Sequence, residues 1–203
     1  AHVIADTYQA AGTVPLSLAA LGVEYAVGGS VKWLCGGPGA GYLYVRPELA
    51  RHLTPAMIGW AAHARPFAFE VGPVDYAEAP ERFQSGTPNV PALYAARAGY
   101  RIVGEVGVER IREHSLQLTR RIIDHARRRG YGVNTPDHDA RRGGTVTIDV
   151  PGAEQVAREL IAREVIVDYR PGAGIRMAPH FYSTGAEIDR ALGVLDDLVA
   201  ARA

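Results

Sequence analysis

A single lysine is the first residue of this sequence that could do chemistry. The 203 residues contain 22 basic side chains, of which only Lys32 is a lysine. An arginine stays charged in a protein, whereas a lysine amine can lose its proton and act as a nucleophile. Lys32 lies in a glycine-dense stretch, residues 28–39, whose backbone can approach a ligand closely. The sequence therefore indicates a catalytic amine, with a chance codon bias towards arginine as the alternative.

Two further residues carry charge at places where a ligand could bind. Asp6 follows a short apolar run typical of a strand end, where α/β sheets bind ligands, although a helix N-cap is an equal alternative. Arg176 lies between apolar residues on a strand expected at 174–177, and it could bind a carboxylate or pair with an internal acidic residue. Asp168 and Arg170 are expected to form a structural pair or a solvated surface.

Other kinds of site lack their sequence signals. Seven histidines are scattered without metal-ligand spacing, and Cys35 is the only cysteine, so neither a metal centre nor an internal disulfide is expected. The sequence has no Gly-x-Ser-x-Gly or phosphate-loop motif. Its formal net charge of zero argues against nucleic acid or an anionic membrane as a partner. No apolar run is long enough to span a bilayer, and the cytoplasm is the expected compartment.

The elements that must position these residues alternate between strands and helices, which predicts an α/β fold. Glycine-bounded runs at 23–27 and 42–45 predict buried strands on either side of the Lys32 loop. Residues 54–89 are rich in Pro, Gly and aromatic side chains and predict a long irregular segment. The remaining elements are expected as helices over 91–104, 108–129, 153–163 and 186–201 and as strands over 145–150, 165–169 and 174–177.

Five motifs span nearly the whole chain. They are Asp6-Thr7-Tyr8-Gln9-Ala10-Ala11-Gly12, Lys32-Trp33-Leu34-Cys35-Gly36-Gly37-Pro38-Gly39, Gly59-Trp60 with His63, Arg82-Phe83-Gln84-Ser85-Gly86-Thr87-Pro88, and Gly174-Ile175-Arg176-Met177-Ala178-Pro179. In this order they resemble the class V aminotransferase group of fold-type-I pyridoxal-phosphate enzymes, and within it kynureninase. The resemblance implies the C-terminal half of such an α/β enzyme. Residues 1–105 would then be the last part of the cofactor-binding large domain, and residues 106–203 a small C-terminal α/β domain.

The resemblance also implies roles for individual residues. Lys32 would hold pyridoxal 5'-phosphate as a Schiff base and then transfer protons. Asp6 would pair with the protonated ring nitrogen, Gln9 would bond the phenolic oxygen, and Ser30 could donate to the phosphate. Arg176 would bind the α-carboxylate of an amino-acid substrate. The resemblance further implies a homodimer with the active site at its interface, where the other subunit would contribute Trp60, Thr87 and Asn89.

Three functions remain open at the level of sequence. The leading hypothesis is hydrolytic cleavage of a kynurenine-type substrate. The second is transamination, or sulfur or carboxyl lyase chemistry, on another amino acid, which Asn89 after Gly-Thr-Pro favours. A desulfurase is less favoured, because Val31 precedes the lysine where desulfurases have histidine. The third is a non-catalytic dimerising module, because the family's ring-stacking aromatic residue and phosphate-binding turn lie upstream of the Asp6 motif.

Overall fold

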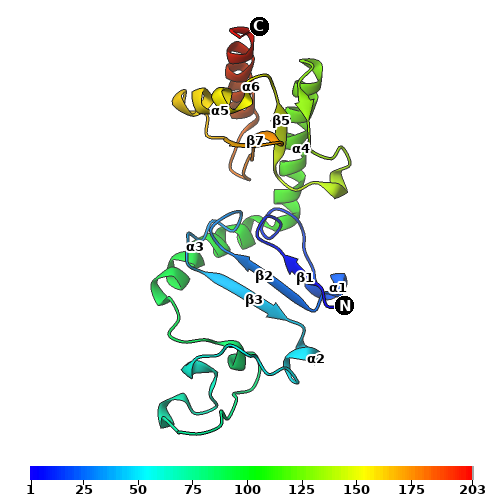
Figure 1. Cartoon of the computed structure of the whole chain (residues 1–203). Helices are drawn as coiled ribbons and strands as arrows, with labels where there is room; N and C mark the ends of the chain where they lie inside the picture. Colours follow the sequence, from blue (N-terminus) through cyan, green and yellow to red (C-terminus); the bar gives the residue numbers. More distant parts are fainter. Residues whose placement is uncertain (203) are drawn as a thin grey trace. The chain divides into compact units, whose positions relative to one another are not determined.

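The computed structural model describes residues 1–202, and the chain divides into two compact units (Figure 1). The first unit comprises Ala1–Ala11 and Leu16–Val103. The second comprises Gly12–Pro15 together with the chain from Gly104 onward. No helix in the described part is both long enough and apolar enough to cross a membrane.

A three-stranded sheet organises the first unit, in the order β1(Ile4–Asp6), β2(Tyr25–Gly29) and β3(Gly41–Val45). β1 and β2 are parallel, whereas β3 runs antiparallel to β2. The strands predicted at 23–27 and 42–45 are thus confirmed as β2 and β3. The prediction that both are buried was wrong, because Val27 of β2 and Leu43 of β3 are exposed. Because β1 and β2 are parallel, the segments that follow them leave the sheet at the same edge.

The two faces of this sheet differ in burial. Ala26 is fully buried on one face. Ile4, Val27 and Leu43 are exposed at 66%, 37% and 53%. Asp6 pairs with Val27, and Val27 pairs with Leu43, so these side chains share the other face of the sheet. Asp6 therefore lies on a face whose apolar side chains are uncovered.

Short helices and turns connect the strands of this unit. The Ser17 side chain caps α1(Leu18–Leu21), which ends at Gly22 in the left-handed conformation (φ 66°). After α2(Pro47–Ala50) the chain is irregular up to residue 89, as predicted. The regular pieces in that segment are the 3-10 turns η1(Trp60–Ala62), η2(Pro66–Ala68) and η3(Glu81–Phe83).

Two long helices follow the irregular segment. α3(Val90–Val106) begins after Asn89, whose side-chain oxygen accepts a hydrogen bond from the Ala92 amide at 3.3 Å. Gly107, with φ at 85°, separates α3 from α4(Val108–Arg128). The two helices predicted over 91–104 and 108–129 are therefore confirmed within the usual uncertainty of helix ends.

The second unit contains an antiparallel four-stranded sheet in the order β4-β5-β7-β6. One face packs with α4, α5 and α6 around a core that includes the buried Ile122, Ile148, Leu160, Ile175 and Leu195. The Thr184 and Glu187 side chains form a capping box that starts α6. After α4 the elements are β4(Gly132–Val133), η4(Asp139–Arg141), β5(Val146–Asp149), α5(Ala153–Ala162), β6(Asp168–Arg170), β7(Gly174–Met177) and α6(Gly185–Ala200).

Two details of this unit differ from the sequence prediction. The strand expected over 165–169 begins only at Asp168, because the Val165 amide donates to the Leu160 carbonyl at 2.9 Å and so completes the end of α5. Val165 is buried for that reason, and its apolar character does not mark a strand. The two-residue strand β4 was not predicted, since its length gives no periodicity to detect.

Candidate active site

Asp6 is the last residue of β1. It therefore lies at the carboxyl end of the strand, where ligands of α/β sheets bind. One carboxylate oxygen accepts a hydrogen bond from the Tyr8 amide at 3.0 Å, and the side chain is exposed. The residues after Asp6 form turns rather than a helix, so the alternative of a helix N-cap does not apply. The Thr7 amide donates to the Val27 carbonyl at 2.8 Å, which ties this turn to the end of β2.

The loop between β2 and β3 carries Lys32. The Gly36 amide donates to the Ser30 carbonyl at 2.7 Å, and the Cys35 amide donates to the Lys32 carbonyl at 3.0 Å. These bonds close the loop on itself while the Lys32 side chain stays exposed. Cys35 takes a positive φ of 54°, a conformation rare for a residue other than glycine. The lysine is thus presented on a tightly closed loop beside the turn that follows Asp6.

Ser30 is fully buried at the base of this loop. Its hydroxyl is within 3.0 Å of the Gly37 and Ala40 carbonyl oxygens, which both compete for its single proton. The hydroxyl therefore stabilises the loop that carries Lys32. A contact with a cofactor phosphate, as predicted from the resemblance, would require this proton to leave both carbonyls.

Gln9 contacts the lysine loop directly. The indole Nε1 of Trp33 donates to the side-chain oxygen of Gln9 at 3.0 Å, and Trp33 is only 5% exposed. Trp33 had no role in the sequence prediction. The available signal was its place immediately after Lys32, although its partner lies 24 residues away along the chain.

The three residues predicted to act from a second subunit lie on the irregular segment and at its end. Asn89 caps α3 and lies against the glycine loop, because a Cβ at Gly39 would be 3.0 Å from its side-chain nitrogen. Trp60 is 49% exposed and packs edge-to-face on Phe67, with ring centroids 5.5 Å apart. Thr87 is exposed. The cofactor contact expected of all three across a dimer stays a prediction.

Arg176 belongs to the second unit, on the sheet face opposite the core. Its Nε and Nη2 donate to the two carboxylate oxygens of Asp168 at 2.6 and 2.5 Å, and this hydrogen bonding raises the pKa of Arg176. Arg170 lies 3.0 Å from the same carboxylate, so the expected pair of Asp168 with Arg170 is confirmed. The internal ion pair considered for Arg176 is also present. It uses the Nε side of the guanidinium, whose Nη1–Nη2 edge could still bind a second carboxylate.

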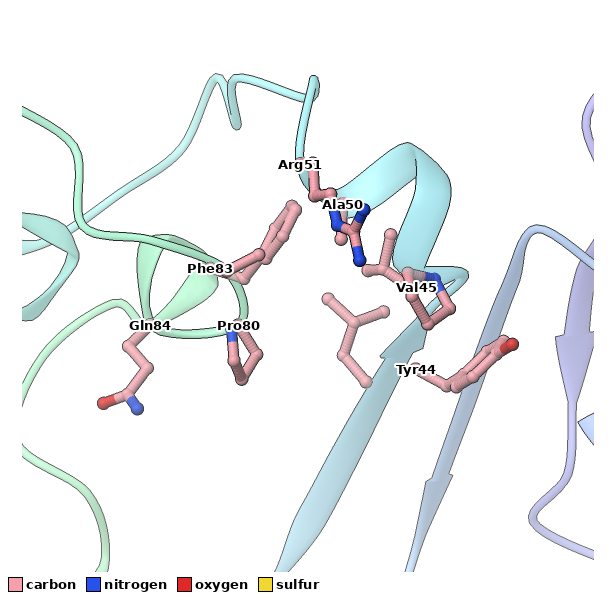
Figure 2. A pocket seen from close by; sticks show the side chains of 10 residues that line it. Tyr44, Val45, Ala50, Arg51, Pro80, Phe83 and Gln84 are labelled. Atoms are coloured by element: carbon pink, nitrogen blue, oxygen red, sulfur yellow. The ribbon is translucent and has the colours of Figure 1, made fainter.

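A hollow of about 670 Å³ opens beside β3 in the first unit, between α2 and the η3 turn (Figure 2). Figure 2 shows Phe83 and Pro80 on one side of it and Ala50 and Val45 on the other. None of the predicted site residues lines it. Its lining is largely apolar and contains no lysine, cysteine, histidine or acidic residue, so the presence of a hollow does not by itself identify the site of chemistry.

Neither an activated thiol nor a metal-binding cluster is found in the part of the chain that the structure describes. Burial raises the pKa of the Cys35 thiol above its ordinary value, which keeps the thiol protonated at neutral pH. In residues 1–202, no group of three or more His, Cys, Asp or Glu side chains is arranged to hold a metal ion. The arrangement best suited to chemistry is therefore at the carboxyl ends of β1 and β2, where Asp6, Gln9 and Lys32 lie.

Comparison with known proteins gives a consistent family. A family profile described as aminotransferase class-V matches residues 1–182. The uncharacterized aminotransferase YcbU of Bacillus subtilis is 34% identical over 92% of this chain and 49% of its own length. A kynureninase of Deinococcus radiodurans is 35% identical over 95% of this chain and 49% of its own length. The apo structure of a cysteine desulfurase from Thermococcus onnurineus superposes with a TM-score of 0.88 at 25% identity.

The length of these matches is as informative as their names. The chain spans about half the length of the curated relatives it matches. The superposition on the desulfurase covers 99% of this chain but 53% of the desulfurase chain. The predicted fold is confirmed: an α/β chain corresponding to about half of a fold-type-I enzyme. The family resemblance drawn from the five motifs is confirmed as well.

Proposed function

The chain belongs to the aminotransferase class-V family, and we propose that it supplies the reactive lysine of a pyridoxal-phosphate enzyme of amino-acid metabolism. The observation that carries this proposal is the closed loop after β2 that presents Lys32, the only lysine. Because β1 and β2 are parallel, this loop lies at the same end of the sheet as Asp6. Pyridoxal phosphate is the cofactor of this family. The chain matches about half the length of its relatives, so binding of the cofactor at Lys32 is proposed for this chain, and turnover for a protein that also has the other half.

The residues at this end of the sheet fit that cofactor in type and position. When bound, the cofactor supplies an electron sink for charge that develops next to the substrate nitrogen. Lys32 would bind its aldehyde carbon and then move a proton between donor and acceptor atoms of the substrate. Asp6 would accept a hydrogen bond from the ring nitrogen with its exposed carboxylate. Gln9, whose side chain is also exposed, would donate to the ring oxygen.

Arg176 would bind the substrate carboxylate through the edge of its guanidinium that Asp168 leaves open. The net charge around Arg176 supports such a role. One carboxylate, that of Asp168, is paired with two arginines, Arg176 and Arg170. This group of three residues therefore keeps one excess positive charge. An anion at Arg176 would meet an attractive field, although the arginine already holds one carboxylate.

Among substrates, the proposal names a kynurenine-type amino acid that is cleaved hydrolytically. The kynureninase relatives at up to 35% identity support this choice. The alternative is transamination or lyase chemistry on another amino acid, supported by the aminotransferase relative and by the likeness to a cysteine desulfurase. Release of anthranilate on incubation with kynurenine distinguishes the two. We also propose a homodimer with the active site at its interface, to which Trp60, Thr87 and Asn89 contribute.

Absorption spectroscopy tests the role of Lys32. Pyridoxal phosphate added to the full chain is expected to give the visible band of lysine-bound cofactor, and the Lys32→Ala variant is expected to lack that band. The chain has no other lysine, so the only other primary amine is its N-terminus. An Arg51→Ala variant, altered at a basic residue away from the loop, is the matched control and should keep the band. A band that persists in Lys32→Ala would contradict the proposal, whereas its absence from the unaltered chain would favour a non-catalytic module.

A further inference from the structure

We propose that Trp33 is a positioning residue that fixes the orientation of the Gln9 amide and so makes Gln9 a hydrogen-bond donor towards a bound cofactor. This inference rests on the proposed function and adds a residue to it. Its basis is the hydrogen bond of 3.0 Å between the Trp33 indole nitrogen and the Gln9 side chain.

The chemistry of the indole decides which end of the amide points where. An indole N–H can only donate, so the Gln9 atom beside it must be the oxygen. The two N–H groups of the same amide then lie at the end of the amide away from this bond, and Gln9 as a whole is an exposed residue. A glutamine without such a partner can exchange its oxygen and nitrogen by rotating its terminal torsion, which has broad, two-fold preferences.

Both partners of this bond are held by the backbone around them. Trp33 is 5% exposed, and the loop that contains it is closed by the bond between Gly36 and Ser30. On the other side, the Ala10 and Ala11 amides both donate to the Thr7 carbonyl, at 3.1 and 2.9 Å, which restricts the turn that carries Gln9. The bond therefore joins two restrained segments, the one after β1 and the one after β2.

This arrangement has a direct consequence for a cofactor bound at Lys32. A donor amide stabilises a negatively charged ring oxygen, whereas an amide oxygen in the same place would repel it. Trp33 immediately follows Lys32, so the loop that carries the reactive amine also sets the polarity of the group facing the ring. Trp33 itself need not touch the cofactor.

The first experiment measures the hydrogen bond without any cofactor. The chain has two tryptophans, so ¹⁵N-labelled protein should show two indole N–H signals, and Trp60→Phe identifies which is which. In Gln9→Ala, the Trp33 indole signal is expected to shift and to exchange faster with water, while the Trp60 signal stays in place. An unchanged Trp33 signal would overturn the inference. Gln9→Glu keeps an acceptor oxygen and should leave the Trp33 indole protected from exchange.

The second experiment measures the effect on the cofactor, by pH titration of the visible band in the full chain with pyridoxal phosphate. Trp33→Phe and Gln9→Ala are each expected to raise the apparent pKa of the band by about one unit. One unit is a tenfold change in the protonation equilibrium, roughly the effect of losing one hydrogen bond to a charged group. Gln9→Glu should raise it further, because a carboxylate would then face the ring oxygen. Trp33→Phe combined with Gln9→Ala should add nothing to Gln9→Ala alone.

The outcomes separate this inference from the function on which it rests. A shift in Gln9→Ala without one in Trp33→Phe would leave the proposed function standing and overturn the role of Trp33. Absence of any visible band from the unaltered chain would contradict the proposed function and the cofactor-facing role of Gln9 together. Should Trp33→Phe fail to fold, Gln9→Ala and Gln9→Glu still test the bond through the indole signals.

Discussion

Ser30 and Arg176 both carry polar groups of the predicted types, and in the structure these groups already form hydrogen bonds within the protein. The Ser30 proton is shared between two carbonyls of its own loop. Arg176 holds Asp168 with two donors of its five. Lys32 differs from them, because its exposed amine is left outside the hydrogen bonds that close its loop. At the scale of single residues, the existing partners of a side chain therefore matter as much as its type.

Asp196 on α6 is a partly buried carboxylate with three polar partners. It accepts hydrogen bonds from the Tyr131 hydroxyl at 2.8 Å and from the His125 ring nitrogen at 3.1 Å, and Arg129 lies 3.1 Å away. Burial alone would raise the pKa of Asp196, but the hydrogen bonds and the nearby positive charges outweigh it and hold the pKa below its ordinary value. Charged Asp196 therefore stabilises the folded chain.

We expect Asp196→Asn to lower the free energy of unfolding by about 1–3 kcal/mol at neutral pH, measured by urea denaturation. Because the folded pKa lies below the unfolded one, this stabilisation is complete above the unfolded value and is lost as the pH falls through the folded value. The difference between the two proteins should thus narrow in acid. Asp189→Asn, in the same helix, removes an exposed pair with Arg121 and should change stability by roughly 0–1 kcal/mol. A difference that does not vary with pH would contradict this explanation.

At the scale of elements, α3 positions the lysine loop through close backbone approach. A Cβ at Gly99 would lie 2.4 Å from the carbonyl oxygens of Leu34 and Cys35, so only glycine lets the helix come this near. A Cβ at Gly36 would likewise lie 2.9 Å from that of Ala96. The glycine content of the loop and of α3 therefore serves packing between the two elements.

Gly99→Ala is expected to destabilise the chain by about 1–3 kcal/mol, because the new methyl group forces α3 and the loop apart. Gly104 of the same helix provides the matched control, since nothing lies within 4 Å of a Cβ there. Gly104→Ala should stabilise the chain by roughly 0.5–1 kcal/mol through helix propensity alone. Thermal unfolding followed by circular dichroism measures both. Equal effects of the two substitutions would show that the close contact is not needed.

At the scale of the whole molecule, the two units differ in how well their sheets are covered. The main hydrophobic cluster lies within the second unit, where Ile148 and Ile175 are fully buried. The first unit leaves Ile4, Val27 and Leu43 of its sheet exposed. Since the relatives of this chain are about twice as long, an incompletely covered sheet is consistent with a chain that matches half of them.

Hydrogen exchange of the full chain should reflect this difference. We expect the strand amides of Ile148 and Ile175 to exchange more slowly than that of Ala26, which lies in the central strand of the first sheet, because opening a well-packed unit costs more free energy. Nuclear magnetic resonance or mass spectrometry can measure the exchange rates. Slower exchange at Ala26 would mean that the first sheet is the more stable one, contrary to the observed burial.

The sequence by itself determined the α/β class and the approximate positions of the helices and longer strands, and it singled out Lys32 and Asp6, whose roles stay predictions. The elements follow from local signals, namely hydrophobic periodicity and glycine boundaries. Lys32 stands out because it is the only lysine of the chain. The family likeness also followed from short motifs in order. The prediction was poorest for the strand expected over 165–169, where the local apolar pattern reflected the buried end of α5.

Only the tertiary structure decided which distant side chains meet. The sheet order β4-β5-β7-β6, the pairing of Asp168 with Arg176 across β6 and β7, and the bond from Trp33 to Gln9 each join residues on separate segments. The physical reason is that such contacts depend on how strands pair and helices pack, which local periodicity does not specify. Through them the chain acquired what the sequence did not reveal: the hydrogen bonds that close the lysine loop and the hydrogen bond from Trp33 to the side chain of Gln9.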